Sequence, residues 1–431
     1  MELRLNPGVL EAIRILNSKG HSAYLVGGAV RDAVMELPPN DFDIATSASH
    51  EELLEIFKDN SAKPYSNGMT VGIGVRGTHI EVTPFKGEDI IADLAKRDFT
   101  INSMAYSINE GLVDPFNGLA DIKNGILRTT ASPTEVFKSD PIRILRGIRI
   151  SAVKGLKIEA STSEAMRSLA YLLNTLKKEK FKAELDPILL VEVPSAAIRE
   201  YIEVFRVIFP PLGDCYKFDQ RNKKWHHLDV FEHIMKVLDS TKNDLVLRYA
   251  ALLHDIKKPE AFTLDEKGIG HFYGHERKSA DYAYEALTGL YYSGQFVSRV
   301  CRLIYFHDYM LVNKEESLLK FLYRFGTNDL DLYFGLRRAD ILGQNPRLYD
   351  RIYEIDSITE HIRALLRDNK IVTFKNLKIK GDMLLEIGFE PVEVGRALKI
   401  ILENVQRGRL KNNPDTLYEF ARSLKYNGMG E

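Results

Sequence analysis

Two aspartates with one residue between them, Asp41 and Asp43, follow a glycine pair at Gly27-Gly28. If residues 41–45 form a strand, side chains two positions apart share one face, and both carboxylates point the same way. Like charges held this close repel unless a cation lies between them, and Mg²⁺ prefers such ligands together with phosphate oxygens. We therefore predict that Asp41 and Asp43 are catalytic magnesium ligands, able to activate a hydroxyl and stabilise a leaving pyrophosphate.

An isolated D-x-D is more simply interpreted as a solvated pair at a strand edge. Here a glycine turn and an Arg-Asp pair precede it within one strand–helix–strand unit, which favours a site. Glycines allow close approach of the backbone to a ligand, and free N–H groups at a helix start attract phosphate. Glu81, in the predicted strand 79–83, is a candidate third carboxylate, although an outward-facing residue is an equal alternative. We predict a nucleotide-binding role for four residues: Gly27, Gly28, Arg31 and Asp32.

The run LVGGAVRDAVMELPPNDFDIATSA at residues 25–48 resembles the signature of class II tRNA nucleotidyltransferases and bacterial poly(A) polymerases. Residues 96–104 resemble the family's R-R-D-F-T-x-N motif, and residues 139–149 resemble its E-D-x-x-R motif with the following helix. The similarity is close over residues 24–150 and looser over the whole chain. It implies a Mg²⁺-dependent enzyme that adds C, and in many members A, from CTP and ATP to the 3′ end of tRNA.

The resemblance also implies roles for individual residues. Arg97 and Asp98 would contact the phosphates and the ribose of the nucleotide, which suits a guanidinium and a carboxylate. Asp140 and Arg143 would read the base edge; their spacing of three predicts one helix face carrying acceptors and a planar donor fork. Arg146 continues that face and could meet a phosphate. Surface ion pairs are the structural alternative for each of these residues.

Three departures from the family pattern bear on the product. Lys96 replaces an arginine, and Ser139 replaces a glutamate beside Asp140. Only residues 86–92 separate the predicted strand from residues 93–97, where many CCA-adding members carry a long loop linked to the switch from C to A addition. The short segment resembles that of CC-adding members, which need a separate A-adding enzyme as partner. CC-only addition, complete CCA addition and poly(A) synthesis all stay open.

Histidines and aspartates recur on apolar helical segments of the second half. His254-Asp255 lies inside the run Ala250–Pro259, where burying both is costly without a partner or an ion. A lone buried histidine is usually a satisfied core residue, so the adjacency carries the argument. Carboxylates and imidazoles spread over several helices make a metal site plausible. The candidates are His233, His254, Asp255, His275, His307 and Asp340.

This second pattern resembles the HD phosphohydrolase superfamily. The resemblance implies that His233, His254, Asp255 and Asp340 hold a divalent transition metal such as Mn²⁺ or Ni²⁺. His275 and His307 would serve a second metal or the phosphate. Lys257 stands where glycine is usual after His-Asp-Ile, which weakens the prediction of a loaded site. Phosphatase or cyclic phosphodiesterase activity and a purely structural role both remain open, and a phosphohydrolase with a regulatory head is the second candidate function.

The elements that must position these residues change in character near residue 150. Helical periodicity over 8–19 precedes a short apolar strand at 23–26, a helix at 29–36 and strands at 71–75 and 79–83. Beyond residue 160 almost all periodicity is helical. We therefore predict an α+β fold, a small mixed α/β head followed by a long all-α region. The predicted parts are the head at 1–150, a helical RNA-binding neck at 151–225, an HD domain at 226–350 and a tRNA-binding tail at 351–431.

Composition sets the remaining bounds. Two cysteines, Cys215 and Cys301, lack disulfide or zinc spacing, and the net charge of −1 argues neither for nor against RNA. The first twenty residues lack an apolar core like that of a signal peptide, and no later run predicts a membrane span. We therefore expect a cytoplasmic enzyme. Basic residues at 406–411 could grip RNA phosphates, with a solvated helix face as the alternative.

Overall fold

The computed structural model describes residues 3–39, 41–65, 68–368 and 372–426. The chain divides into two compact units, residues 1–210 and 211–431. Within the described residues, no helix is long and apolar enough to cross a membrane. The finer division of the chain into four parts stays a prediction.

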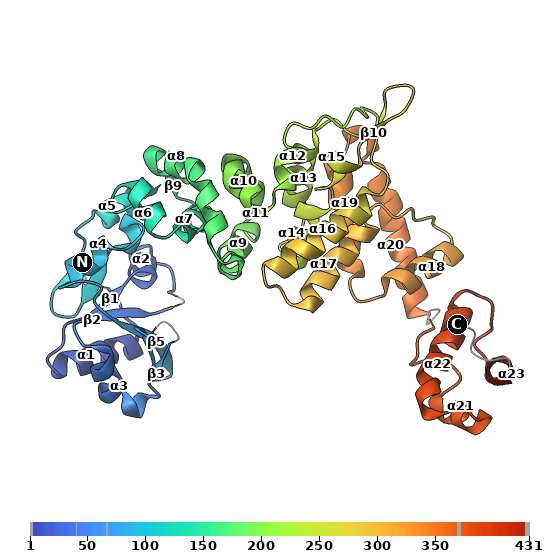
Figure 1. The fold of residues 1–431 in the computed structure, drawn as a ribbon, viewed down its shortest axis with the longest axis horizontal. Helices are drawn as coiled ribbons and strands as arrows, with labels where there is room; N and C mark the ends of the chain where they lie inside the picture. The colour runs from blue at the N-terminus through green and yellow to red at the C-terminus, as the bar shows by residue number, and fades with distance from the viewer. Residues whose placement is uncertain (1–2, 40, 66–67, 369–371, 427–431) are drawn as a thin grey trace. The chain divides into compact units, whose positions relative to one another are not determined.

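The first unit contains a seven-stranded sheet in the order β3-β4-β5-β2-β1-β6-β7 (Figure 1). Neighbouring strands are antiparallel except for β2 and β5, which run parallel. The strands are β1 (Ala23–Val26), β2 (Asp43–Thr46), β3 (Lys63–Pro64), β4 (Val71–Val75), β5 (Thr78–Pro84), β6 (Ala105–Ser107) and β7 (Gly111–Val113). The predicted strand at 41–45 begins two residues later than expected, so Asp41 precedes the sheet.

Both faces of this sheet are covered, which explains why β1 is apolar at every position. Ala23 and Leu25 belong to a core that includes Val9 and Ile13 of the first helix. Tyr24 and Val26 point to the other face, into a smaller cluster with Leu94. The first helix begins cleanly because Pro7 follows Asn6, whose side chain caps the Gly8 N–H at 2.8 Å.

Helices surround and extend the sheet within the first unit. They are α1 (Pro7–Ser18), α2 (Gly28–Val34), α3 (His50–Ile56), α4 (Ile90–Ala95), α5 (Gly118–Asn124), α6 (Pro133–Ser139), α7 (Ile142–Lys154), α8 (Ala160–Ser168), α9 (Lys182–Leu189), α10 (Pro194–Glu200) and α11 (Ile202–Ile208). Two short strands, β8 (Ile126–Leu127) and β9 (Lys157–Ile158), pair in parallel. The α+β character predicted from the sequence is confirmed.

Among its described residues, the second unit is helical apart from one small hairpin, β10 (Thr263–Leu264) with β11 (Gly270–His271). Its helices are α12 (Pro211–Cys215), α13 (Val230–Asp239), α14 (Leu245–Leu253), α15 (Lys258–Ala261), α16 (His275–Gly289), α17 (Gly294–Phe306), α18 (Glu315–Phe325), α19 (Leu330–Gly343), α20 (Arg351–Arg367), α21 (Gly381–Ile387), α22 (Pro391–Gln406) and α23 (Pro414–Tyr426).

Helices α13, α14 and α19 pack on one another, and α17 packs on α14 and α16 (Figure 1). Their contact faces are mostly apolar; on α14, for example, every residue from Val246 to Leu253 is buried, and Arg248 is the one charged residue among them. The last three helices form a separate core that includes Leu384, Ile401 and Leu417. The histidines and aspartates predicted to bind metal lie on or just beyond the packed helices.

Candidate functional site

The glycine turn after β1 brings the backbone against two predicted site residues. Gly27 has φ +71°, a conformation that side chains rarely adopt, and it caps the start of α2. A Cβ added there would lie 3.0 Å from Arg97 Nη1 and 3.8 Å from Asp43 Oδ2. The bare backbone is therefore what leaves room between the guanidinium and the carboxylate.

Three carboxylates gather around the start of β2, beside this turn. Asp43 is paired in register with Glu81 across the parallel strands β2 and β5, and the Glu81 N–H donates to Phe42 O at 2.9 Å. Burial raises the pKa of Asp43, and the charges of Glu81 and Asp41 raise it further, while Arg97 and Lys86 lower it. Partly buried carboxylates that destabilise one another's charged forms fit a divalent cation.

The Arg31-Asp32 pair is tied into the protein. Arg31 donates to the Asp32 carboxylate and to Asn102 Oδ1, both at 2.8 Å, and Lys154 from α7 lies 2.9 Å from Asp32. Both members of the pair are buried. This network joins α2 to Asn102 and to Lys154, the last residue of α7. The pair therefore supports the glycine turn in addition to any ligand contact.

Arg97 and Asp98 are adjacent in the chain, and each is held by its own set of hydrogen bonds. Arg97 donates twice to the buried Asp93 carboxylate, at 3.1 and 3.0 Å. Asp98 accepts from Phe99 N–H at 2.8 Å, from Asn102 at 3.0 Å and from Arg146 at 3.1 Å. Burial raises the pKa of Asp98, but Arg146 and the hydrogen bonds outweigh it and hold that pKa below its ordinary value.

Asp140 and Arg143 are not on one helix, as their spacing had predicted. Asp140 ends α6 in an extended conformation (φ −154°, ψ 97°), and Pro141 caps the start of α7. The residue before a proline is driven out of the helical region, which is the physical reason. Arg143, in the first turn of α7, donates to Lys96 O at 2.9 Å and to Ser139 Oγ at 3.3 Å. The two residues thus approach from a turn and a helix.

The segment between β5 and Arg97 is short, and hydrogen bonds hold it in place. The strand ends at Pro84, and α4 begins at Ile90 with Asp89 as its cap. Lys86 N–H donates to Asp93 Oδ1 at 3.1 Å, and Lys96 Nζ donates to Lys86 O. The segment that is a long loop in many CCA-adding members is here held at both ends.

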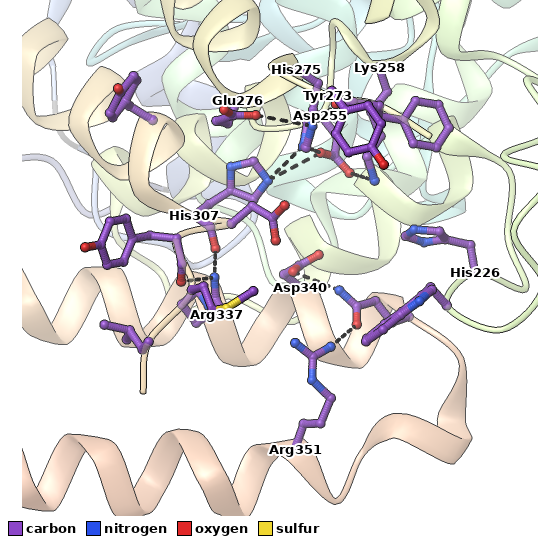
Figure 2. Close-up of a pocket in the computed structure, with 18 of the residues that line it drawn as sticks. His226, Asp255, Lys258, Tyr273, His275, Glu276, His307, Arg337, Asp340 and Arg351 are labelled. Atoms are coloured by element: carbon purple, nitrogen blue, oxygen red, sulfur yellow. Dashed lines mark hydrogen bonds and ion pairs between the residues drawn. The ribbon is translucent and has the colours of Figure 1, made fainter. Parts of the chain in front are cut away.

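The six predicted residues of the HD cluster converge, as Figure 2 shows for Asp255, His275, His307 and Asp340. Each histidine holds a backbone carbonyl with Nδ1: His233 to Gly343 O at 3.0 Å, His254 to Ala251 O at 2.8 Å, and His275 and His307 to Phe272 O and Ile304 O at 2.7 Å. Because a carbonyl can only accept, each Nδ1 carries the proton. Each Nε2 therefore turns a lone pair toward the cluster.

When the rings are neutral, the facing ring nitrogens and carboxylate oxygens of these six residues are all acceptors. His233 Nε2 lies 3.3 Å from His254 Nε2, 3.1 Å from Asp255 Oδ2 and 3.2 Å from Asp340 Oδ1. On the other side, His275 Nε2 lies 3.3 Å from His307 Nε2 and 3.1 Å from Asp255 Oδ1. Two overlapping sets of possible metal ligands result, His233–His254–Asp340 and His254–Asp255–His307.

The electrostatics of the buried cluster agree with a cation. Burial lowers the pKa of His233, but Asp255 and Asp340 raise it to about 9 overall, so the carboxylates favour a positive charge at this point. His233 and His254 are fully buried, and Asp255 and Asp340 nearly so. Buried imidazoles and carboxylates of this kind suit a divalent transition metal.

Two lysines follow the His-Asp pair and behave differently. Lys257, which stands in place of the usual glycine, has φ −103° and places its ammonium 2.8 Å from Glu260, away from the cluster. No left-handed conformation is needed there, so the substitution leaves the cluster geometry intact. Lys258 places Nζ 2.6 Å from Asp255 Oδ2. Sequence reasoning missed Lys258, although its position three residues after Asp255 was a usable signal.

A pocket of about 820 Å³ opens over the cluster. Its wall includes His226, whose pKa is lowered to about 2 by burial and by Lys258. It also includes Gln344, which donates to Asp340 at 3.0 Å and accepts from Arg351 at 2.8 Å (Figure 2). No local sequence pattern pointed to His226, Gln344 or Arg351, because folding alone brings them to the cluster.

Comparisons with known proteins match a family to each of the two parts of the chain that carry these residues. Residues 23–128 match the poly A polymerase head domain, and residues 225–342 match the HD domain. The CCA-adding enzyme of Streptococcus thermophilus is 29% identical over 97% of this chain and 96% of its own length. The CCA-adding enzyme of Streptococcus gordonii is 28% identical over 97% and 96%.

Solved structures show the same fold. The Bacillus stearothermophilus CCA-adding enzyme in complex with CTP has a TM-score of 0.67 at 22% identity, covering 98% of this chain and 99% of that one. The Thermotoga maritima CCA-adding enzyme complexed with tRNA-CCA has a TM-score of 0.58 at 21% identity, covering 98% and 97%.

A nucleotidyltransferase head followed by an HD domain is the class that this fold and these sites define. The chain is similar over nearly its whole length to CCA-adding enzymes. The resemblance stated from the sequence motifs is thereby confirmed.

Proposed function

We propose that this protein adds C from CTP to the 3′ end of tRNA, with release of pyrophosphate. The observation that carries the proposal is the gathering of Asp41, Asp43 and Glu81 beside the Gly27 turn, in a chain similar to CCA-adding enzymes over nearly its whole length. We place the reaction in the cytoplasm, where tRNA is matured.

In this mechanism Asp41 and Asp43 hold Mg²⁺, with Glu81 as the third carboxylate. The ion, when bound, supplies electrostatic stabilisation of the attacking hydroxyl and of the leaving pyrophosphate. The open backbone at Gly27 admits the phosphates, and Arg97, fixed by Asp93, faces them. Asp98 orients the ribose while Arg146 and Asn102 fix its carboxylate.

For base reading we propose Asp140 and Arg143. The carboxylate can accept from an exocyclic amine, and the planar guanidinium can donate to ring acceptors, which suits C and A. Their placement on a turn and a helix lets one residue shift against the other. The backbone and hydroxyl contacts of Arg143 would have to be exchanged for the base when the nucleotide binds.

The order of addition is tested with three tRNA transcripts that lack CCA, end in C or end in CC, each offered CTP and ATP separately and together. We propose that growth stops at CC, because the 86–92 segment is short and held at both ends. A separate A-adding enzyme would then be the partner. Addition of A to the transcript ending in CC would overturn this and indicate complete CCA addition, whereas long A tracts would indicate a poly(A) polymerase.

A second candidate function is metal-dependent hydrolysis of phosphate esters at the HD cluster, favoured by four inward-facing Nε2 lone pairs around Asp255. Release of phosphate or nitrophenol from simple esters in the presence of Mn²⁺ or Ni²⁺ tests it. Activity that survives in the double variant His254→Ala/Asp255→Ala would contradict the assignment. CTP incorporation by that same variant serves as the control for an intact head.

A further inference from the structure

The third carboxylate of the head, Glu81, lies in the middle of β5 between two neighbouring strands. Its register partners are Asp43 in β2 and Gly72 in β4. Side chains of residues paired across neighbouring strands stand on the same face of a sheet. A side chain that lies over Gly72 is therefore on the face that carries Glu81 and Asp43, and it can reach the carboxylate of Glu81.

The ring of Tyr65 lies over Gly72. Tyr65 follows β3 directly after Pro64, and its N–H donates to Thr70 O at 2.9 Å. Gly72 is buried although it has no side chain, and a Cβ added there would lie 2.8 Å from Tyr65 Cε2. A glycine at this position of β4 is therefore what allows the tyrosine ring to cross the strand.

The hydroxyl of Tyr65 ends beside His79 and Glu81, which are two residues apart and share one face of β5. Its oxygen lies 2.9 Å from His79 Nε2. Partial burial, a hydrogen bond with the Glu81 carboxylate and the negative charges of Glu81 and Asp43 raise the pKa of Tyr65. The phenol therefore keeps its proton next to the carboxylate.

The direction of these hydrogen bonds follows from what each group can donate. An ionised Glu81 only accepts, so the Tyr65 O–H donates to it, and the Tyr65 oxygen accepts from His79 Nε2–H. The phenol occupies one acceptor position of the carboxylate and leaves the others for a cation. A tyrosine that only covered Gly72 would not need its hydroxyl for this purpose, so the hydroxyl is the group to test.

We propose that Tyr65 is a positioning residue of the head: its hydroxyl, supported by His79, holds the Glu81 carboxylate in the orientation that faces Asp43. The inference rests on the proposed function, because the orientation of Glu81 affects the reaction only if Glu81 is a ligand of Mg²⁺. Hydrogen-bond partners of ligating carboxylates orient them, and loss of such a partner lowers metal affinity about 10- to 100-fold. In this role Tyr65 acts through Glu81 and not on the reacting atoms.

Metal affinity is measured directly with Mn²⁺, because the free ion gives an electron paramagnetic resonance signal that is lost on binding. The full chain is titrated without nucleotide, and the binding that Asp43→Asn removes is assigned to the head. We expect Tyr65→Phe, which keeps the ring over Gly72, to weaken this binding about 10- to 100-fold. A loss smaller than about threefold would overturn the proposal.

The variant Gly72→Ala tests the same contact without changing the tyrosine. The added methyl group should push the Tyr65 ring aside, so we expect Mn²⁺ affinity to fall by a factor similar to that of Tyr65→Phe. Combining both substitutions should weaken binding no further, since each removes the same interaction. Gly74→Ala is the matched control on the same face of β4, because a Cβ there would lie 3.7 Å from Asn60 O, an ordinary contact. Equal affinities of the two alanine variants would contradict the proposal.

Kinetics separate positioning from support of the fold. In CTP incorporation into tRNA, Tyr65→Phe should raise the Mg²⁺ concentration for half-maximal rate by the same factor, and excess Mg²⁺ should restore the rate to within about threefold of the parent protein. A rate that stays low at every Mg²⁺ concentration would contradict a role through the metal.

Failure of the two proposals looks different. If the parent protein incorporates no CTP, the proposed function fails, while the Mn²⁺ titrations still test Tyr65. If the parent protein incorporates CTP and Tyr65→Phe matches it in Mn²⁺ affinity and in Mg²⁺ requirement, only the positioning role fails.

Discussion

The two candidate metal centres of this chain are built in opposite ways. In the head, Asp41 is exposed and Asp43 and Glu81 are half-buried, around the start of β2 beside the glycine turn at Gly27. In the second unit, His233 and His254 are fully enclosed, and each imidazole is fixed through Nδ1 by a backbone carbonyl.

This difference predicts that the two sites bind their metal ions in different ways. An open carboxylate set binds a hard cation weakly and leaves positions for phosphate oxygens, so the ion can arrive with the nucleotide. A closed set of imidazoles with fixed tautomers is preorganised and keeps its metal between reactions. If this is right, disturbing the head should change activity far more than stability, and disturbing the second cluster should change both.

The largest effect is expected from Asp43→Asn. Loss of this carboxylate should lower CTP incorporation into tRNA by about 10³-fold or more, because transition-state charge loses its counter-ion. Burial and Glu81 already disfavour the charged form of Asp43, so the neutral amide should leave the free energy of unfolding unchanged or slightly higher. Unfolding in urea checks stability. Incorporation at the parent rate would show that Asp43 is not a metal ligand.

Removal of metal should act on the second cluster. Chelation is expected to lower the free energy of unfolding of the second unit by about 3 kcal/mol, if metal is present at about one hundred times its dissociation constant. Thermal unfolding, followed by the fluorescence of Trp225, the single tryptophan of the sequence, with and without chelator, measures this change. His254→Ala should purify without the metal and show no response to chelation. If the chelator leaves the thermal unfolding of the parent protein unchanged, the second cluster holds no stabilising metal and the contrast between the two sites fails.

Asp98→Asn tests whether Asp98 stabilises the fold of the head, in contrast to the carboxylates of the predicted Mg²⁺ site. We expect a loss of about 2 kcal/mol in stability, reduced from that of a fully buried pair because Arg146 is 37% exposed. The pKa of Asp98 is depressed, so its contribution is present above the unfolded value of 3.8 and is lost as pH falls through the folded one. Acid should therefore destabilise the variant less than the parent. Equal acid sensitivity would rule out this role.

The smallest effect is expected around the closed cluster. Gln344→Ala should weaken metal affinity about tenfold, since the amide holds Asp340 Oδ2 at 3.0 Å. Lys257→Gly is the matched control and should leave affinity within about twofold, because Lys257 faces Glu260 instead. Competition titration with a metal indicator measures both. A larger effect of Lys257→Gly than of Gln344→Ala would reverse this assignment.

Much of the head was predictable because its signals are local. The glycine turn, the carboxylate spacing and the apolar run of β1 each depend on neighbours in sequence. Glu81 was predicted only as one of two equal alternatives, because its proximity to Asp43 depends on the parallel pairing of β2 with β5. The shared helix face predicted for Asp140 and Arg143 was wrong for a local reason, because Pro141 between them ends one helix and starts the next.

The histidine–aspartate cluster shows which residues of a site the sequence can predict and which it cannot. Its six candidate residues could be named because aspartate and histidine inside apolar helices are conspicuous, and the structure brings them together. The groups around them come from distant segments: Gln344 follows α19, Arg351 begins α20 and His226 precedes α13. Long-range packing places such residues, and periodicity carries no information about it.

The carbonyls that fix His254 and His307 belong to the last turns of α14 and α17, each three residues before the histidine. Both carbonyls lie in a last helical turn, where backbone donors run out, and Ile304 O accepts in addition from the backbone N–H of His307 at 3.3 Å. Fraying of either helix end would therefore release a ring and scramble its tautomer, and metal held by the rings must suppress fraying in return. Amide hydrogen exchange at these two helix ends and occupancy of the cluster are thus one linked equilibrium, which makes the end of a helix part of the coordination chemistry.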